Sequence, residues 1–265
     1  MARKRSGEGQ TALVTGASSG IGLELAECFA QDGYGLILAA RSEAALKQLA
    51  EKLAKENKIA ATAIAVDLGQ PGGAQKLIDE IRKRNLSVDV VVNNAGYGIV
   101  GTFDGSNSAD QVGMIDLNVR ALTELTHAFW PGMIAKKRGG VLNIASTASF
   151  QPGPGMAVYY ATKAFVLSFS EALWKEGRKA GVHVTCDCPG PTESNFHSRA
   201  GSDKIKLLKM GVTMTSKAVA KQAYNAFKRN RRVIINGGMN RTMARLIPFT
   251  PRRMVLNLVS YLQTI

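Results

Sequence analysis

The sequence is poor in cysteine and contains no long apolar run. Its three cysteines, Cys28, Cys186 and Cys188, are too few and too scattered for a disulfide framework. Cys186 and Cys188 stand two residues apart in an apolar run, so we expect small buried side chains on one face of a strand. No stretch reaches the roughly 18 apolar residues of a membrane span, and residues 1–10 lack the apolar segment of a secretory signal. The sequence therefore predicts a cytoplasmic protein.

Histidine is equally scarce. His127, His183 and His197 show no spacing typical of metal ligands, so the sequence predicts no metal site. Of the three, only His197 lies in a segment that we expect to reach a substrate.

Acidic residues are outnumbered by basic ones. The 34 Lys and Arg against 20 Asp and Glu give a formal net charge of +14. Such an excess favours anionic partners: phosphorylated cofactors, acidic substrates, anionic lipid or nucleic acid. The basic clusters are short and have no interleaved aromatic side chains on which bases would stack. We therefore expect no nucleic-acid partner.

Short apolar runs alternate with longer segments of helical period along the whole chain. The runs predict strands at residues 11–15, 35–40, 60–66, 88–93, 140–145, 182–188 and 232–236, and the longer segments predict helices at 20–32, 43–57, 72–84, 109–137, 158–180 and 216–229. Strands that are apolar throughout are typical of a sheet covered on both faces. The pattern predicts an α/β fold, a single Rossmann-like doubly wound domain over residues 1–265 with a seven-stranded parallel sheet. Residues 192–215 lack periodicity and are expected to form a substrate lid, and residues 239–265 a helical C-terminal extension.

Three glycines follow the first predicted strand, in Thr15-Gly16-Ala17-Ser18-Ser19-Gly20-Ile21-Gly22. Gly16 allows a tight turn, Gly20 lets the backbone approach a pyrophosphate, and Gly22 permits close packing of helix on strand. The N-terminus of the following helix offers unpaired N–H groups to phosphates. The pattern predicts a dinucleotide site.

The end of the second predicted strand bears on which dinucleotide binds. Enzymes that use NAD place an acidic residue there for the ribose 2′-hydroxyl, but this chain has Arg41, and its first acid is Glu43. A guanidinium matches a 2′-phosphate through two hydrogen bonds. Arg41 therefore predicts NADP(H), the alternative being a solvated arginine at a strand end.

Tyr159 and Lys163 stand four residues apart and share one face of a predicted helix. A carbonyl that receives a hydride becomes an alkoxide and needs a proton. A phenol with a pKa near 10 is a poor partner at neutral pH, and a nearby ammonium lowers that pKa. We therefore expect Lys163 to lower the pKa of Tyr159. Tyr160 has no lysine four residues on and is interpreted as a packed aromatic.

Further motifs occur in a fixed order: Asn93-Asn94-Ala95-Gly96, Asn118, Ser146, Tyr159-Tyr160-Ala161-Thr162-Lys163 and Pro189-Gly190-Pro191-Thr192. With the glycine turn, these motifs resemble the classical short-chain dehydrogenase/reductase family over about residues 11–238. The resemblance implies four catalytic residues: Asn118, Ser146, Tyr159 and Lys163. It implies that the cofactor is held by Gly16, Ser18, Ser19, Gly20, Ile21, Gly22, Arg41, Asp67, Leu68, Asn94, Ala95, Gly96, Tyr159, Lys163, Pro189, Gly190 and Thr192.

The roles of the catalytic residues follow partly from that resemblance. Ser146 would donate a hydrogen bond to the developing oxyanion, with Thr147 and Ser149 as neighbouring hydroxyls. Lys163 would also hold the nicotinamide ribose. Asn118 would hold a water in a proton relay through Lys163, the alternative being a buried amide that bends its helix.

The expected reaction is the NADP(H)-dependent interconversion of a small-molecule carbonyl and a secondary or primary alcohol. One alternative is a 3-oxoacyl-thioester reductase of lipid metabolism, because a basic surface would attract the phosphates of a carrier arm. Another is a non-catalytic dinucleotide sensor, which would have no need of Asn118, Ser146, Tyr159 and Lys163.

The resemblance also implies a homodimer or homotetramer, paired through the helices at 109–137 and 158–180. Six apolar residues there exceed what one sheet face needs: Leu117, Leu122, Leu125, Phe165, Leu173 and Trp174.

The C-terminal tail has an apolar stripe with arginines at its start. Pro248 and Pro251 must interrupt any helix between residues 246 and 252. The stripe then consists of Met254, Val255, Leu258, Val259 and Leu262. It would either dock on protein and wall the substrate pocket or lie on an anionic membrane. We favour docking, because a helix this short binds membranes weakly and arginines at its N-terminus oppose the helix dipole.

Overall fold

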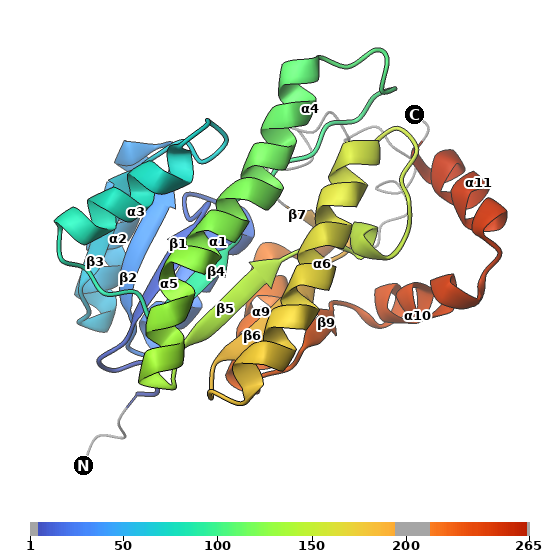
Figure 1. Cartoon of the computed structure of the whole chain (residues 1–265). Coiled ribbons are helices and arrows are strands. Elements are labelled where there is room, and N and C mark those ends of the chain that lie inside the picture. Colours follow the sequence, from blue (N-terminus) through green and yellow to red (C-terminus); the bar gives the residue numbers. More distant parts are fainter. Residues whose placement is uncertain (1–4, 194–212, 264–265) are drawn as a thin grey trace.

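The computed structural model describes residues 5–193 and 213–263. Seven parallel strands form one sheet in the order β3-β2-β1-β4-β5-β6-β9, which confirms the predicted fold class (Figure 1). The strands are β1 (Thr11–Thr15), β2 (Gly35–Ala40), β3 (Ala61–Ala65), β4 (Val90–Asn93), β5 (Gly140–Ile144), β6 (His183–Cys188) and β9 (Val233–Ile235). The order reverses between β1 and β4, so a crevice opens at their carboxyl ends.

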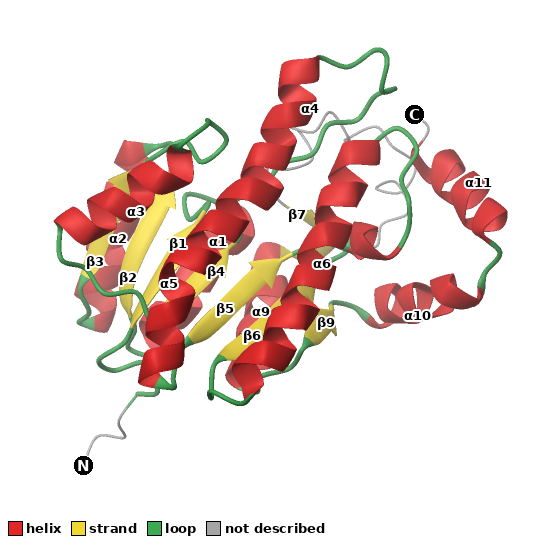
Figure 2. Ribbon diagram, viewed as in Figure 1, coloured by secondary structure: helices red, strands yellow, loops and turns green. Residues whose placement is uncertain are grey.

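Helices cover both faces of the sheet (Figure 2). One face packs against α1 (Gly20–Gln31), α2 (Glu43–Asn57) and α9 (Ser216–Lys228), and the other against α3 (Gly73–Lys83), α5 (Leu122–Lys136) and α6 (Ala157–Arg178). Successive side chains of a strand point to opposite faces. Leu36 and Leu38 accordingly belong to the first core with Phe29, whereas Ile37 belongs to the second with Leu77.

The predicted helix at residues 109–137 has three parts. Between α4 (Ser108–Ile115) and α5 lies a π-helical segment, Asp116–Ala121, which contains Asn118. Such segments widen one turn of a helix and are frequent at functional sites. Helical periodicity does not distinguish this turn from an ordinary one.

Two strands were not predicted. β7 (Thr192–Glu193) pairs in parallel with β8 (Met214–Thr215), which joins the two ends of the segment predicted as a lid. Two-residue strands are too short to show an alternating pattern. Residues 194–212 of that segment, including His197, lie outside the described residues.

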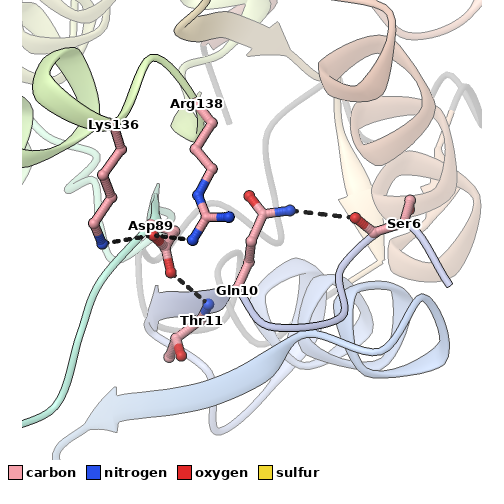
Figure 3. Close-up of polar contacts among 6 residues, drawn as sticks. All are labelled: Ser6, Gln10, Thr11, Asp89, Lys136 and Arg138. Atoms are coloured by element: carbon pink, nitrogen blue, oxygen red, sulfur yellow. Dashed lines mark hydrogen bonds and ion pairs between the residues drawn. The ribbon is translucent and has the colours of Figure 1, made fainter. Parts of the chain in front are cut away.

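Asp89 immediately precedes β4 and contacts residues of two other elements; Figure 3 shows these contacts. Its carboxylate is 2% exposed, accepts from the backbone N–H of Thr11 at 3.0 Å and pairs with Lys136 at 2.9 Å. Arg138 lies 3.8 Å from the same carboxylate. A buried carboxylate with these partners ties β1 and β4 to the end of α5.

The tail forms two helices on either side of the prolines, α10 (Gly238–Leu246) and α11 (Arg252–Gln263), separated by the 3₁₀ turn Ile247–Phe249. Val255 and Val259 of the predicted stripe are buried in one cluster with Met156, Tyr159 and Tyr160. This side of α11 therefore docks on its own chain. No helix in the described part of the chain has the length and apolar character that crossing a membrane requires.

The six apolar residues that supported the prediction of a homodimer or homotetramer pack at least partly within one chain. Leu122 and Leu125 are buried, and Leu117, Leu173 and Trp174 are partly buried against the core. Only Phe165, stacked on Phe169, is exposed among the six. Leu122 and Leu125 are therefore unavailable for a subunit contact, and the oligomer stays a prediction.

Candidate active site

A cavity of about 1550 Å³ opens at the carboxyl ends of the strands and extends to α10 and α11. Nearly all the site residues predicted from the sequence line it: Gly16, Ser18, Ser19, Gly20, Ile21, Arg41, Asp67, Leu68, Asn94, Ala95, Gly96, Ser146, Tyr159, Lys163, Pro189, Gly190 and Thr192. Gly22 and Asn118 do not line the cavity but contact residues that do. A methyl group at Gly22 would overlap the carbonyl of Gly16 and the amide of Asn94.

The glycine turn is held by side chains from two strands. Thr15 Oγ1 accepts hydrogen bonds from the backbone N–H groups of Asn94 (3.0 Å) and Ala95 (3.1 Å). The Asn94 side chain in turn donates to the carbonyl of Thr15 at 2.9 Å. The amide of Asn94 is thus used to fix the turn, a role that the motif alone did not indicate.

The start of α1 fits an anionic phosphate. Gly16 has φ +65° and Gly20 φ +59°, left-handed conformations that glycine adopts without strain. Within the described residues, no side chain caps α1 and no acid stands in its first turn. The unpaired N–H groups of this turn border the cavity beside Ser18 and Ser19.

Arg41 and Asp67 line the cavity from the ends of two further strands. Arg41 follows β2, is exposed, and makes no salt bridge with any described residue. Asp67 follows β3, and its Oδ1 accepts from the N–H of Gly69 at 3.0 Å. A guanidinium without a salt-bridge partner among the described residues, in the same cavity as an uncapped helix N-terminus, fits a dinucleotide that carries an additional phosphate.

Tyr159 is a buried residue of α6, and its hydroxyl is hydrogen-bonded to Ser146. Ser146 lies immediately after β5, where its Oγ also accepts from the N–H of Ala148 at 3.1 Å. Ser149, the neighbouring hydroxyl, instead donates to the carbonyl of Lys163 at 2.8 Å. These contacts support Ser146 as the serine that works with Tyr159.

Lys163 follows Tyr159 by one turn of α6, and its Nζ lies 5.8 Å from the centre of the tyrosine ring. The Nζ donates to the carbonyl of Ile144 at 2.9 Å. Burial lowers the pKa of Lys163 from 10.5 to about 8.

The expectation that Lys163 lowers the pKa of Tyr159 is wrong for the chain by itself. Burial raises the pKa of Tyr159 above its usual value of 10, and the hydrogen bond from Ser146 lowers it by less. Desolvation prevails because both groups are buried and the ammonium is held by the carbonyl of Ile144. Tyr159 is therefore a protonated acid at neutral pH.

Asn118 fixes the loop that follows β4. Its Oδ1 accepts from the N–H of Tyr97 (3.2 Å), and its Nδ2 donates to the carbonyl of Tyr97 (3.0 Å) and to Thr162 Oγ1 (3.1 Å). A methyl group at Gly96 would lie 3.0 Å from Asn118 Oδ1 and 3.4 Å from Lys163 Nζ. The side chain thus packs next to Lys163, and the relay remains a prediction.

Several lining residues were not singled out from the sequence. Tyr97 and Gln151 line the cavity outside the predicted motifs, and Met243, Ile247 and Gln263 belong to the tail. Their types are common in any protein core, so the only available signal was the apolar periodicity of the tail.

The comparison with known proteins agrees with this geometry. The family model for short chain dehydrogenases matches residues 10–205. The chain belongs to the short-chain dehydrogenase family, a family of oxidoreductases.

Two relatives that are similar in sequence to this chain are named for different reductase activities. A very-long-chain 3-oxoacyl-CoA reductase of Phaeosphaeria nodorum is 36% identical over 187 residues, which are 67% of this chain and only 53% of the relative. The chain thus matches about half the length of that protein. Sulfoacetaldehyde reductase 2 of Chromohalobacter salexigens is 37% identical over 195 residues, 72% of this chain and 77% of the relative.

Solved structures are similar over nearly the whole chain. A short-chain dehydrogenase from Sphingobium yanoikuyae in complex with NADPH has a TM-score of 0.79 and 31% identity, covering 92% of this chain and 97% of that one. L-Sorbose reductase from Gluconobacter frateurii, complexed with NADPH and L-sorbose, has a TM-score of 0.77 and 25% identity, covering 89% and 98%.

Proposed function

We propose that this chain is an NADP(H)-dependent oxidoreductase that interconverts a carbonyl compound and a primary or secondary alcohol. The observation that carries the proposal is the contact of Tyr159 with Ser146 in the same cavity as the glycine turn and Arg41. Proton donor and dinucleotide site therefore border one space, as a reduction requires.

The chain's own residues would handle the proton and orient the substrate. Tyr159 Oη, protonated at neutral pH, gives its proton to the substrate oxygen as negative charge develops there. Ser146 Oγ donates a second hydrogen bond to that oxygen. Lys163 Nζ, on the same face of α6, would hold the ribose of the cofactor and favour return of a proton to Tyr159. When bound, the nicotinamide cofactor supplies or accepts the hydride.

The N-terminus of α1, with Ser18 and Ser19, would hold the pyrophosphate, and Asp67 and Leu68 would border the adenine. Arg41 would pair with the 2′-phosphate and so select NADP(H) over NAD(H). This preference is supported by the free guanidinium and by the NADPH in the two similar solved structures.

Arg41→Asp is expected to raise KM for NADPH by roughly 10–100-fold, because it replaces a charge-assisted hydrogen bond with a repulsive carboxylate. The same change should lower KM for NADH. Initial rates with both cofactors measure it, with Arg41→Gln as the control that removes charge without reversing it. Equal catalytic efficiency of the wild type with NADH and NADPH would contradict the assignment.

A 3-oxoacyl-thioester reductase is the second candidate, favoured by the relative from Phaeosphaeria nodorum and by the extension of the cavity along the tail. A silent dinucleotide sensor fits less well, because it would have no use for a buried tyrosine hydrogen-bonded to Ser146. A screen of NADPH oxidation over ketones, aldehydes and 3-oxoacyl thioesters tests all three functions. The sensor predicts NADPH binding with no oxidation for any compound.

A further inference from the structure

The part of the cavity beyond Tyr159 is bounded by the two tail helices. Six residues of this apolar wall, Met243, Leu246, Ile247, Met254, Leu258 and Leu262, line the cavity. Met243, Leu246, Met254 and Leu258 are among the exposed large apolar residues of the chain. Apolar side chains that stay exposed inside a cavity are available to bind an apolar ligand.

Buried residues of the same apolar stripe of α11 hold the wall against the catalytic residues. Val255 and Val259 are buried beside Tyr159 and Tyr160. In the last turn, Gln263 Nε2 donates to Tyr160 Oη at 2.6 Å, and both side chains are buried. Because Tyr160 adjoins Tyr159, this bond fixes the wall next to the reacting oxygen.

Charged side chains are few among the described residues that line the cavity. Among the described lining residues, Arg41 and Asp67 belong to the part of the cavity proposed to bind the dinucleotide, and Lys163 follows Tyr159 by one turn of α6. The other two charged residues, Asp110 and Asp116, come from α4 and the π-helical segment and are acidic. The tail arginines do not line this cavity. The apolar wall thus offers an anionic substrate no cation. Asp110 adds a like charge to the cavity lining, whereas Asp116 is paired with Arg120 at 3.0 Å.

We propose that the site takes uncharged carbonyl compounds with a bulky or long apolar group, which lies along the apolar wall while the carbonyl meets Tyr159 and Ser146. The inference rests on the proposed reductase activity and names its substrate class. It separates this chain from the relative that reduces sulfoacetaldehyde, whose substrate carries a sulfonate.

The first test compares substrates in the NADPH oxidation assay. Along a series of 2-alkanones from four to twelve carbons, kcat/KM should rise by about fourfold for each methylene that reaches the wall. 3,3-Dimethylbutanal, a neutral compound of nearly the shape of sulfoacetaldehyde, should be reduced at least 100-fold more efficiently than sulfoacetaldehyde. A kcat/KM that does not change with the chain length of the 2-alkanone, or a higher kcat/KM for sulfoacetaldehyde, would overturn the inference while leaving the reductase activity intact.

The second test uses a matched pair on α10. Met239 and Met243 are 55% and 50% exposed, but only Met243 lines the cavity. Met243→Asn should lower kcat/KM for 2-dodecanone about tenfold and leave 2-butanone unchanged, whereas Met239→Asn should change neither. Leu258→Asn repeats the test from α11. Equal effects of Met239→Asn and Met243→Asn would contradict a specific wall.

A readout without turnover separates the two proposals. In the presence of NADPH, 2-dodecanol should raise the thermal unfolding temperature of the wild type more than 2-butanol does, and the difference should shrink in Met243→Asn. Alcohol binding without oxidation of NADPH by any carbonyl would contradict the proposed function alone. If 2-dodecanol and 2-butanol raised the unfolding temperature equally, the result would contradict the proposed role of the apolar wall in substrate binding.

Discussion

Tyr159→Phe is expected to lower kcat by about 10³-fold or more while NADPH binding stays within about twofold of the wild type. The change removes the proton that the substrate oxygen must receive, and general acid catalysis contributes roughly 10²–10⁴-fold. It also leaves Ser146 without its phenol partner. The ring volume is kept, so the packing against Val255 and Val259 should persist.

The neighbouring tyrosine supplies the matched control. Tyr160 is buried on the same helix turn, but its hydroxyl is bound to Gln263. Tyr160→Phe should therefore keep kcat within about tenfold of the wild type for a short ketone. Single-turnover rates and NADPH fluorescence titrations measure both variants. Turnover by Tyr159→Phe within about tenfold of the wild type would remove Tyr159 from the catalytic role.

Lys163→Met is expected to abolish turnover and, in the absence of cofactor, to stabilise the folded chain. The charged lysine is buried, and its pKa of about 8 instead of 10.5 means that folding disfavours the ammonium. The difference corresponds to about 3 kcal/mol near neutral pH. Losing the hydrogen bond to the carbonyl of Ile144 offsets about 1 kcal/mol of this gain. Turnover is lost because Lys163 serves both the ribose and the proton return to Tyr159.

The sign of the pH dependence follows from the lowered pKa. Below about pH 8 the folded chain carries the full cost of the buried ammonium, and above about pH 10.5 neither state is protonated. Between these values the unfolded chain binds more protons, so wild-type stability rises with pH relative to Lys163→Met. Urea unfolding of both proteins at pH 7 and pH 10 should show that the difference in their free energies of unfolding is smaller at pH 10.

Lys136→Met is the control of opposite sign. Lys136 is a half-exposed lysine paired with the buried carboxylate of Asp89 at 2.9 Å. Its removal should destabilise the chain, because it leaves Asp89 with fewer partners. A stability loss in Lys163→Met as large as that in Lys136→Met would contradict the cost of burying Lys163.

Local patterns were sufficient for the architecture and for most of the predicted site residues that line one cavity. The strands are nearly all apolar and bounded by turn residues, so their positions follow from burial on both faces; for β1 and β2 the bounds are those predicted. The glycine turn and the pair Tyr159–Lys163 depend on spacings of a few residues, which the chain order alone fixes. The parallel topology then brings these motifs to one edge of the sheet.

What the tertiary structure decided depends on residues far apart in the chain. Gln263 contacts Tyr160 across 103 positions. The periodicity of the tail predicted the apolar stripe but did not distinguish Val255 and Val259, which are buried beside Tyr159, from Met254 and Leu258, which stay exposed. The pKa of Tyr159 is raised although a lysine stands four residues away, because desolvation depends on everything packed around the phenol. The sequence by itself thus determined the fold and indicated the groups that we propose to react, whereas the protonation of Tyr159 and the packing of α11 against it were set by long-range contacts.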